Sequence, residues 1–285
     1  MAKVSFRPST SQATHVVRGL DLESVRTEKN YLGAIKGVAK FLQENKLGDL
    51  RSLDAEKALA YLEIRGQEVS QKTLDMDRQA IQAVLGEKLP VVKSELQTTL
   101  ESRAYTHEQA VMVAGAQSEK HSLATQIAEN AGLRAHELLT LRPVEERQAD
   151  THREYRDDRF TGRTDVKIYT VEGKGGLCRE VAIDRPLVDQ LESRRLDEPR
   201  IVYDRDVKYE QHYNIGGGKQ WADSFSKAAD RALGWSTGAH GLRHEFAQER
   251  MNTLQGNGYE YREALEIVSQ EMGHFRPEIT EVYLR

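Results

Sequence analysis

The stretch QEMGHFRPEITEVYLR, residues 270–285, carries His274 and, nine positions later, Tyr283. It follows HGLRHEF, which begins at His240 and places Arg243 one helical turn later. At this spacing the histidine and the arginine project from nearly the same face of a helix. Such a pair can bind a phosphate, and a tyrosine hydroxyl becomes a nucleophile once it loses its proton. Together the two stretches indicate attack of a phenol on a phosphodiester.

Two stretches nearer the N-terminus add side chains of the kinds that phosphate chemistry uses. NAGLRAHELLTLR places Arg134 three residues before Glu137, and VEGKGGLCREV places Lys174 between two glycines. A phosphodiester is an anion whose transition state gathers further charge on the non-bridging oxygens, so permanently cationic, forked donors suit it. We therefore expect Arg134 and Arg243 to bind the phosphate, and Glu137 to orient its cationic neighbours.

In order and spacing, these motifs resemble the catalytic domain of the tyrosine site-specific recombinases, the phage-integrase family, from about Tyr105 to Arg285. The resemblance implies that Tyr283 attacks a DNA phosphate and forms a 3′-phosphotyrosyl link. The 5′ hydroxyl released in this step then attacks the link on a partner duplex. Because the link conserves the energy of the broken bond, rejoining needs neither ATP nor another cofactor. The catalytic set that the resemblance implies is Arg134, Lys174, His240, Arg243, His274 and Tyr283.

Two members of this set have alternative roles. His240 can donate to a phosphate oxygen or take the proton of the attacking phenol, because an imidazole titrates near neutral pH. Lys174, at the tip of an expected hairpin, can protonate the departing 5′ oxygen, and the alternative is a solvent-exposed turn lysine. His244 stands four residues after His240, a spacing that can bind zinc. Gly241 occupies the position where zinc proteases have a glutamate, so no metal is expected.

The resemblance also implies partners. These are double-stranded DNA with inverted-repeat core sites, a homotetramer that exchanges strands through a four-way junction, and accessory DNA-bending proteins. Integration, excision and dimer resolution share this chemistry, and we favour the recombinase of a mobile element. Two other interpretations stay open. One is a type IB topoisomerase, which relaxes DNA as a monomer, and the other is a catalytically silent DNA-binding regulator with the same fold.

The chain is expected to form a helical domain at residues 1–104 and a catalytic domain at residues 105–285, with a linker near 99–105. The breaker Pro90 and an N-cap at Thr106, with Gln109 as its capping-box partner, mark this boundary. The resemblance implies that the first domain is a SAM-like core-binding domain, which closes around the duplex with the catalytic domain. Its expected helices lie at about 22–44, 54–65 and 70–86, with a further one near 93–102.

The first of these helices has two distinct faces. At about 100° per residue, Lys29, Lys36 and Lys40 fall on one line, while Ile35 and Leu42 lie opposite. A charged face of this kind is typical of a solvated surface. In a domain that the resemblance assigns to DNA, the three lysines become candidate DNA-binding residues.

The second half of the chain has mostly helical periodicity, so we expect a mainly α fold with a small antiparallel β-sheet. Alternation over 168–172 and again over 179–183 predicts a β-hairpin with Lys174 at its tip. The charged stretch 145–163 stands where the family's first strand usually follows the Arg134 helix, which leaves that strand and its register open, and we interpret the stretch as an insertion. NIGGGKQW, which ends at Trp221, is expected to be a flexible loop. The expected helices lie at 106–115, 121–130, 134–141, 186–196, 221–233, 240–254, 262–272 and 277–283.

Composition limits where such a protein works. The net charge of -4, 38% hydrophobic content and 30% charged content are ordinary for a soluble globular chain. Since neither half is strongly basic, DNA binding would come from local stripes of charge. Cys178 is the only cysteine, which excludes an internal disulfide and favours a reducing compartment. Without an apolar signal-peptide core or a membrane-spanning stretch, we expect a cytoplasmic protein, associated with the nucleoid when bound to DNA.

The sequence given ends at Arg285, two residues after Tyr283, whereas many relatives continue into a segment that docks on a neighbouring protomer. This departure leaves two arrangements open: Tyr283 acts in its own protomer, or it is delivered to a neighbour in trans.

Overall fold

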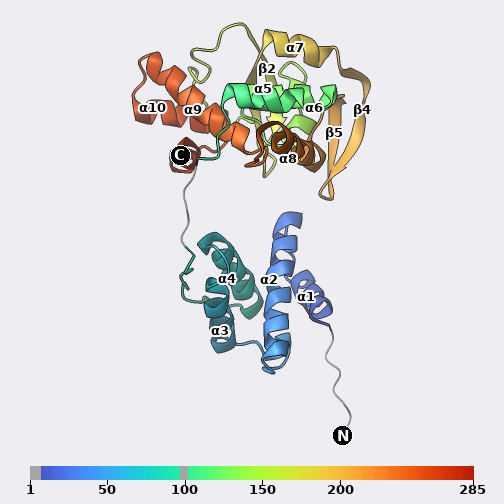
Figure 1. Ribbon diagram of the computed structural model, residues 1–285, viewed down its shortest axis with the longest axis vertical. Helices are drawn as coiled ribbons and strands as arrows, with labels where there is room; N and C mark the ends of the chain where they lie inside the picture. The colour runs from blue at the N-terminus through green and yellow to red at the C-terminus, as the bar shows by residue number, and fades with distance from the viewer. Residues whose placement is uncertain (1–7, 97–101) are drawn as a thin grey trace. The chain divides into compact units, whose positions relative to one another are not determined.

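The computed structural model describes residues 8–96 and 102–285. The chain divides into two compact units, Met1–Leu100 and Glu101–Arg285, which are drawn in Figure 1. The linker expected at 99–105 spans this division, and its residues 99–101 lie outside the described residues. None of the helices in the described ranges is long and apolar enough to cross a membrane.

The first unit is a small helical bundle. Its elements are α1 (Ser9–Arg18), α2 (Val25–Glu44), the 3-10 turn Leu50–Ser52, α3 (Ala55–Gly66) and α4 (Gln71–Leu85). Local capping defines two of the helix ends: the Asp54 carboxylate accepts a hydrogen bond from the backbone N–H of Lys57 at 2.9 Å and starts α3. Gly86, at a φ of 74°, ends α4 in the left-handed conformation. The apolar sides of the helices meet in one core around Ile35 and Leu62.

Two features of this unit differ from the sequence prediction. Helix α1 was not predicted, because its burial against α2 rests on small residues such as Ala13 and on Val17, which give a weak periodic signal. The further helix expected near 93–102 is absent over 93–96, and 97–101 lie outside the described residues. There the Ser94 N–H donates to the Gln71 side-chain oxygen at 2.8 Å, which holds the chain in a non-helical conformation along α4.

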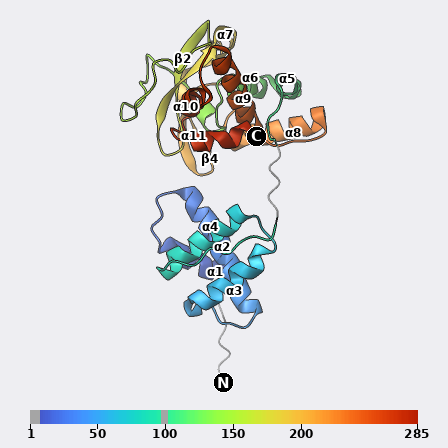
Figure 2. The same cartoon turned by 90° about the vertical axis from the view of Figure 1, so that its left-hand side faces the viewer.

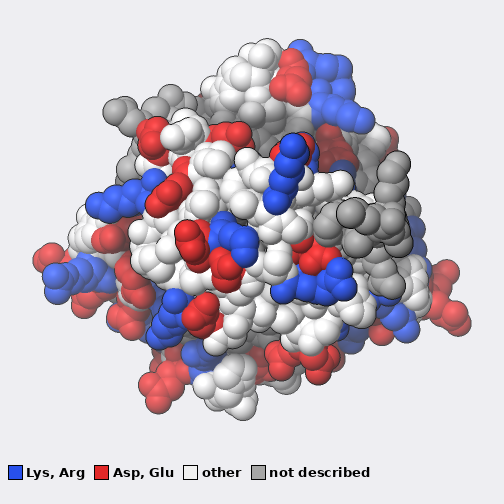
Figure 3. All heavy atoms as spheres, turned by 90° about the horizontal axis from the view of Figure 1, so that it is seen from below, with Lys and Arg blue, Asp and Glu red and all other residues white. Residues whose placement is uncertain are grey.

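Helix α2 has the two faces that its sequence predicts. Ile35 and Leu42 are fully buried, whereas Lys29, Lys36 and Lys40 are exposed. Lys40 forms an ion pair with an acidic side chain one turn away, at 3.6 Å. On the face shown in Figure 3, Lys and Arg are interspersed with Asp and Glu rather than gathered in one patch.

The second unit combines helices with two small antiparallel sheets, which confirms the predicted fold class. One sheet has the strand order β1-β2-β3, and the other pairs β4 with β5. Helices α9, α10 and α11 lie together near the C-terminus (Figure 2). The helices are α5 (His107–Gly115), α6 (Glu119–Asn130), α7 (Arg185–Glu192), α8 (Gly218–Leu233), α9 (Gly241–Gly256), α10 (Tyr261–Glu271) and α11 (Pro277–Thr280). The strands are β1 (Arg142–Pro143), β2 (Val166–Glu172), β3 (Cys178–Asp184), β4 (Arg195–Asp204) and β5 (Val207–Tyr213), and 3-10 turns lie at Glu137–Leu139 and Glu281–Leu284.

The predicted hairpin is formed by β2 and β3. Their register runs from Val166 opposite Asp184 to Glu172 opposite Cys178, so Lys174 lies in the connecting turn as expected. The predicted capping box of α5 is also present, with the Thr106 hydroxyl and the Gln109 side chain bonding each other's backbone N–H groups.

A second hairpin, β4–β5, was not predicted. The helix expected at 186–196 ends at Glu192, and β4 begins at Arg195. Charged residues and Pro199 interrupt the alternation of β4, and its pairing with β5 shifts register between Arg195 and Arg200. Alternation is the signal that identifies a strand in a sequence, so this irregular strand is not recognised.

Two further predictions for this unit were wrong. The helix expected at 134–141 is replaced by the short 3-10 turn Glu137–Leu139, in which backbone N–H groups bond carbonyls three residues earlier. NIGGGKQW is packed rather than free. The N–H of Gly216 donates to the Lys120 carbonyl at 2.9 Å, and that of Gly218 donates to the Ala135 carbonyl at 2.7 Å. The glycines permit this close backbone approach.

The charged stretch 145–163 contains no strand or helix. Ion pairs of its arginines anchor it to the rest of the unit. Arg156 pairs with Asp158 at 2.9 Å and with Glu266 of α10 at 3.1 Å, and Arg163 pairs with Asp184 at 2.8 Å. β1 has only two residues, and ion pairs with β3 and α10 hold the following stretch in place.

Candidate active site

Tyr283 and His240 meet at the C-terminal end of the chain. The Tyr283 hydroxyl lies 3.0 Å from His240 Nε2. The phenol ring also packs against two other imidazoles, at 4.7 Å from His244 and 5.0 Å from His274 between ring centroids. The Gln248 side chain of α9 donates to the Tyr283 carbonyl at 3.2 Å, which holds the terminal turn on that helix. The hydroxyl therefore has a proton acceptor within hydrogen-bond distance.

Arg243 is fully buried one turn into α9. Its Nη1 donates to the Gly132 carbonyl, and its Nη2 donates to the Met272 carbonyl at 3.1 Å. Its Nε is buried without a partner among the described residues. Burial, and then the nearby Arg134, lower the pKa of Arg243 to about 9, so it stays cationic at neutral pH. This guanidinium is rigidly held and keeps one unused donor.

His274 is held in one tautomer. Arg243 Nη2 lies 3.2 Å from His274 Nε2, and an arginine can only donate, so Nε2 is the acceptor. The proton then sits on Nδ1, which is 3.0 Å from the hydroxyl of the buried Thr280. Burial, followed by the charge of Arg243, lowers the pKa of His274 to about 3. His274 is therefore neutral at physiological pH.

The same causes act on His240, whose pKa is lowered first by desolvation and then by Arg243. The pKa of His244 is also lowered, mainly by desolvation. The positive charge of the site thus comes from arginines and not from imidazolium groups. A neutral His240 can take a proton from the phenol, which is the role of a general base.

Arg134 and Glu137 form the second half of the site. Glu137 Oε2 accepts the Arg134 backbone N–H at 2.8 Å, and Oε1 accepts Arg134 Nη1 at 2.7 Å. Glu137 is completely buried. Burial alone would raise its pKa, but the guanidinium groups of Arg179, Arg134 and Arg243 hold it well below the usual range. Arg134 Nε and Nη2 make no hydrogen bond to the parts of the chain that the structure describes, so they can bind an anion.

Lys174 is exposed in the turn between β2 and β3, and its ammonium has no ion pair with the residues described. The turn begins beside the site: a Cβ at Gly173 would lie 3.4 Å from Glu137 Oε1 and 3.9 Å from Arg134 Nη1. The structure thus gathers six predicted residues, five of them from the catalytic set and the sixth the supporting Glu137, and it sets the hairpin of Lys174 next to them. Lys29, Lys36 and Lys40 belong to the other unit.

Sequence reasoning missed Arg179 of β3, whose Nη2 donates to Glu137 Oε2 at 2.9 Å. It is fully buried. Its position could have been noticed, because Arg179 is in phase with the buried Val181 and Ile183 along the strand. An arginine on the inward face of a strand requires a buried carboxylate partner.

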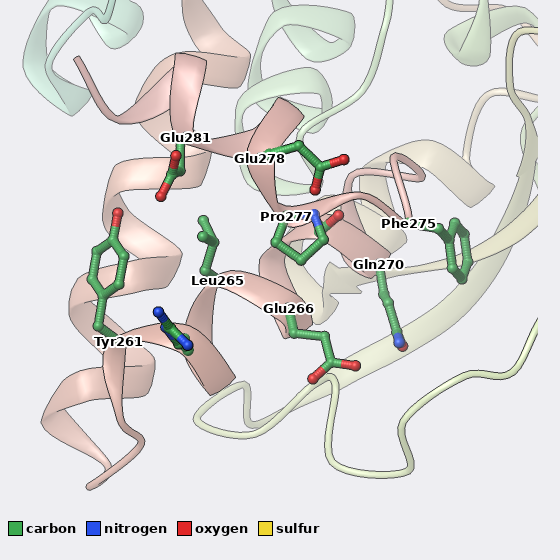
Figure 4. Close-up of a pocket in the computed structure, with 10 residues that line it drawn as sticks. Tyr261, Leu265, Glu266, Gln270, Phe275, Pro277, Glu278 and Glu281 are labelled. Atoms are coloured by element: carbon green, nitrogen blue, oxygen red, sulfur yellow. The ribbon is translucent and has the colours of Figure 1, made fainter.

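A separate hollow of about 590 Å³ is lined by residues of α10 and α11 and by Phe275 (Figure 4). Three glutamates, Glu266, Glu278 and Glu281, stand on its wall, with Arg262 as the one lining cation. None of the predicted catalytic residues lines it. Its mostly negative wall is unsuited to a DNA phosphate, so it is not part of the site.

No protein-family model matches the sequence, and no curated protein sequence matches it. Solved structures do match. One is XerH site-specific recombinase bound to difH substrate in a pre-cleavage complex, with a TM-score of 0.60 and 15% identity over 97% of this chain and 81% of that one. A post-cleavage XerH complex on palindromic difH has a TM-score of 0.59 and 12% identity, covering 99% and 94%. A lambda integrase tetramer bound to a Holliday junction has a TM-score of 0.59 and 15% identity, covering 96% and 76%. Over nearly its whole length, this chain has the fold of the tyrosine site-specific recombinases.

Proposed function

We propose that this protein is a site-specific DNA recombinase that cuts and rejoins DNA through a phosphotyrosyl link on Tyr283. The observation that supports this most directly is the 3.0 Å approach of the Tyr283 hydroxyl to His240 Nε2. The Arg243 guanidinium lies 5.7 Å from the centre of the same phenol ring. A nucleophile, a base and a phosphate-binding cation thus occupy one place.

The cleavage step uses each of these groups once. Tyr283 Oη forms a bond to phosphorus as its proton passes to His240 Nε2, and the bond from phosphorus to the 5′ oxygen breaks. Lys174 gives a proton to the departing 5′ oxygen. The unused nitrogens of Arg134 and Arg243 bind the non-bridging oxygens, where charge accumulates. The reverse sequence, with a 5′ hydroxyl of a partner strand as the attacking group, rejoins the DNA.

The two phosphate-binding arginines, Arg134 and Arg243, are called the clamp below. His274 and Glu137 orient the clamp and do not themselves bind the DNA backbone. His274 accepts from Arg243 Nη2 at 3.2 Å and so sets the plane of that guanidinium. Glu137 Oε1 accepts from Arg134 Nη1 at 2.7 Å and so orients the Arg134 guanidinium. In this division of roles the histidines can be neutral, because the arginines supply the positive charge that binds the phosphate.

We further propose double-stranded DNA with inverted repeats as substrate, and a tetramer as the exchanging assembly. The likeness to structures solved on DNA and on a Holliday junction supports this part of the proposal. We propose that the chain is divided into domains 1–104 and 105–285. Lys29, Lys36 and Lys40 of the first domain bind the DNA backbone. We propose that the protein works in the cytoplasm and recombines a mobile element. DNA-bending proteins are the proposed accessory factors.

The test is covalent capture. Fragmented host DNA is incubated with the wild-type protein or with Tyr283→Phe, the mixture is denatured, and DNA attached to protein is sequenced. Adducts from the wild type alone, at a shared inverted-repeat sequence, are the expected result. If neither protein yields adducts while both bind DNA, the regulator interpretation replaces the enzyme. Relaxation of a plasmid without target sequence by the wild type would instead indicate a topoisomerase.

A further inference from the structure

Arg179 is an unusual residue to find in a protein interior. Its exposed fraction is 0%, and only Nη2 is bonded, to Glu137 Oε2 at 2.9 Å. Its Nε and Nη1 are buried without a partner among the described residues. A buried ion pair contributes little to stability compared with apolar residues of the same volume, and unpaired buried N–H groups oppose folding. Stability therefore does not explain this arginine.

The surroundings of Arg179 connect two parts of the site. On one side is Glu137, whose carboxylate holds the Arg134 guanidinium at 2.7 Å. On the other side lies Gly273, in the left-handed conformation with a φ of 70°, where a Cβ would come within 2.6 Å of Arg179 Nε. The turn at Gly273 leads directly to His274. One guanidinium therefore supports both the clamp and the His274 turn.

The charges of this cluster also fit a reacting phosphate. Arg134, Arg179 and Arg243 bring three positive charges, and Glu137 brings one negative charge. Because the histidines are neutral, two positive charges remain in excess. A pentavalent phosphate in this chemistry carries up to about two negative charges, one more than the ground state. Without Arg179 the excess would fall to one positive charge, because Glu137 would cancel one of the two charges of Arg134 and Arg243.

We propose that Arg179 is a positioning residue of this site: it holds Glu137 as the shared counter-ion of the clamp and supports the turn that carries His274. This inference rests on the proposed function, since the clamp is taken to bind the phosphate that Tyr283 attacks. Arg179 itself does not touch the DNA. It acts through Glu137, Arg134 and the His274 turn.

The first experiment compares Arg179→Met with a matched variant, Arg163→Met. Arg163 is nearly buried, pairs with Asp184 at 2.8 Å, and lies at the opposite end of the β2–β3 hairpin from the Lys174 turn. Covalent adduct formation is measured per DNA-bound protein on a captured target site. We expect Arg179→Met to be slowed about 100-fold, as misplaced catalytic groups are, and Arg163→Met by less than about threefold. Arg179→Lys, which keeps the charge, should recover part of the rate.

A second pair of variants keeps the test valid if Arg179→Met does not fold. Gly273→Ala leaves Arg179 in place but presses a methyl group onto its Nε. Gly258→Ala carries the same backbone strain, at a φ of 90°, with nothing within 4 Å of the new atom. We expect adduct formation to fall in Gly273→Ala and to persist in Gly258→Ala. Equal rates in the two glycine variants, or in the two arginine variants, would overturn the inference while leaving the proposed function intact.

A third readout requires no DNA. With ¹³C-labelled glutamate, the Glu137 carboxyl signal is assigned by its loss in Glu137→Gln and followed by NMR. In the wild type it should stay ionised between about pH 5 and about pH 8, and in Arg179→Met it should take up a proton within that window. Superimposed titrations would contradict the role of Arg179 even if no adduct ever formed. Absence of wild-type adducts, by contrast, would contradict only the proposed recombinase.

Discussion

At the scale of single residues, the site keeps its histidines neutral by burying them, and neighbouring arginines add to the effect. His274 shows this most clearly, because Arg243 must donate to its Nε2 and the proton is left on Nδ1, facing Thr280. The motif spacing was enough to predict that His240, Arg243 and Tyr283 come together. It could not predict their protonation, which depends on burial and on cations from distant parts of the chain.

The low pKa of His274 predicts how stability responds to acid. The unfolded chain takes up this proton below about pH 6.5, whereas the folded protein excludes it until about pH 3. The stabilisation is therefore complete above pH 6.5 and is lost as the pH falls from there towards 3. We expect unfolding in urea to show a loss of about 1–2 kcal/mol from this residue between pH 7 and pH 5.

The matching variant is His274→Phe, which removes the titrating group. Between pH 7 and pH 5 its free energy of unfolding should change less than that of the wild type, whatever its absolute stability. His15, exposed on α1 in the other unit, serves as the control, and His15→Phe should leave the difference unchanged. A wild-type pH response in His274→Phe would show that the imidazole titrates normally in the folded state.

At the scale of elements, capping residues and periodicity predicted what local sequence controls. The capping box of α5 and the β2–β3 hairpin followed directly from Thr106, Gln109 and the alternation of the strands. The prediction was wrong where distant contacts decide the conformation. At 134–141 the helical pattern gives only a 3-10 turn, in a segment whose Glu137 side chain bonds Arg179 of β3. A polar network between segments leaves no periodic trace in a single sequence.

The turn at Gly132 gives a test at this scale. Gly132 has a φ of 59°, its carbonyl accepts from Arg243, and a Cβ there would lie 2.4 Å from the Phe246 ring. We expect Gly132→Ala to lower the free energy of unfolding by about 2–4 kcal/mol, from the strained backbone and the overpacked core together. Urea unfolding followed by circular dichroism measures the change.

The control is Gly234→Ala at the end of α8. Gly234 has a φ of 79°, but nothing lies within 4 Å of the added atom, so only the backbone strain remains. We expect a loss of about 1 kcal/mol there. If the two alanine variants unfold alike, contact with Phe246 is not what restricts position 132, and the Phe246 ring yields to the added methyl group at little cost.

At the scale of the whole molecule, each unit has its own hydrophobic core, and the candidate site lies entirely in the second. The sequence predicted a helical part followed by a mixed part because helical periodicity changes to strand alternation only after about residue 165. It left open whether the tyrosine acts within its own protomer. In this structure Tyr283 reaches His240 of the same chain, with Gln248 holding its carbonyl.

This arrangement predicts that mixing two defective variants does not restore the formation of covalent adducts. Tyr283→Phe lacks the nucleophile but keeps the clamp, and Arg134→Gln lacks part of the clamp but keeps the nucleophile. We expect their mixture to give no more covalent adduct than Arg134→Gln alone, measured on a target duplex with both proteins bound. Arg134 is suited to this test because it is partly exposed, with 22% of its side chain accessible, and because Arg179 still pairs with Glu137 when Arg134 is replaced.

Adduct formation restored by mixing would mean that the terminal turn leaves α9 and enters a neighbour's site on DNA. The control is a mixture of the wild type with Tyr283→Phe. It should give adduct in proportion to the wild-type protein present.

Glu137 serves three guanidinium groups at once, and this has a consequence for how the protein can change over generations. The value of any substitution at 134, 137, 179 or 243 depends on which residues occupy the other three positions, because each alters the charge that the same carboxylate must balance. These positions should therefore be inherited as one unit. Laboratory evolution that varies them one at a time would meet impaired intermediates, whereas libraries that vary all four together can reach alternative solutions.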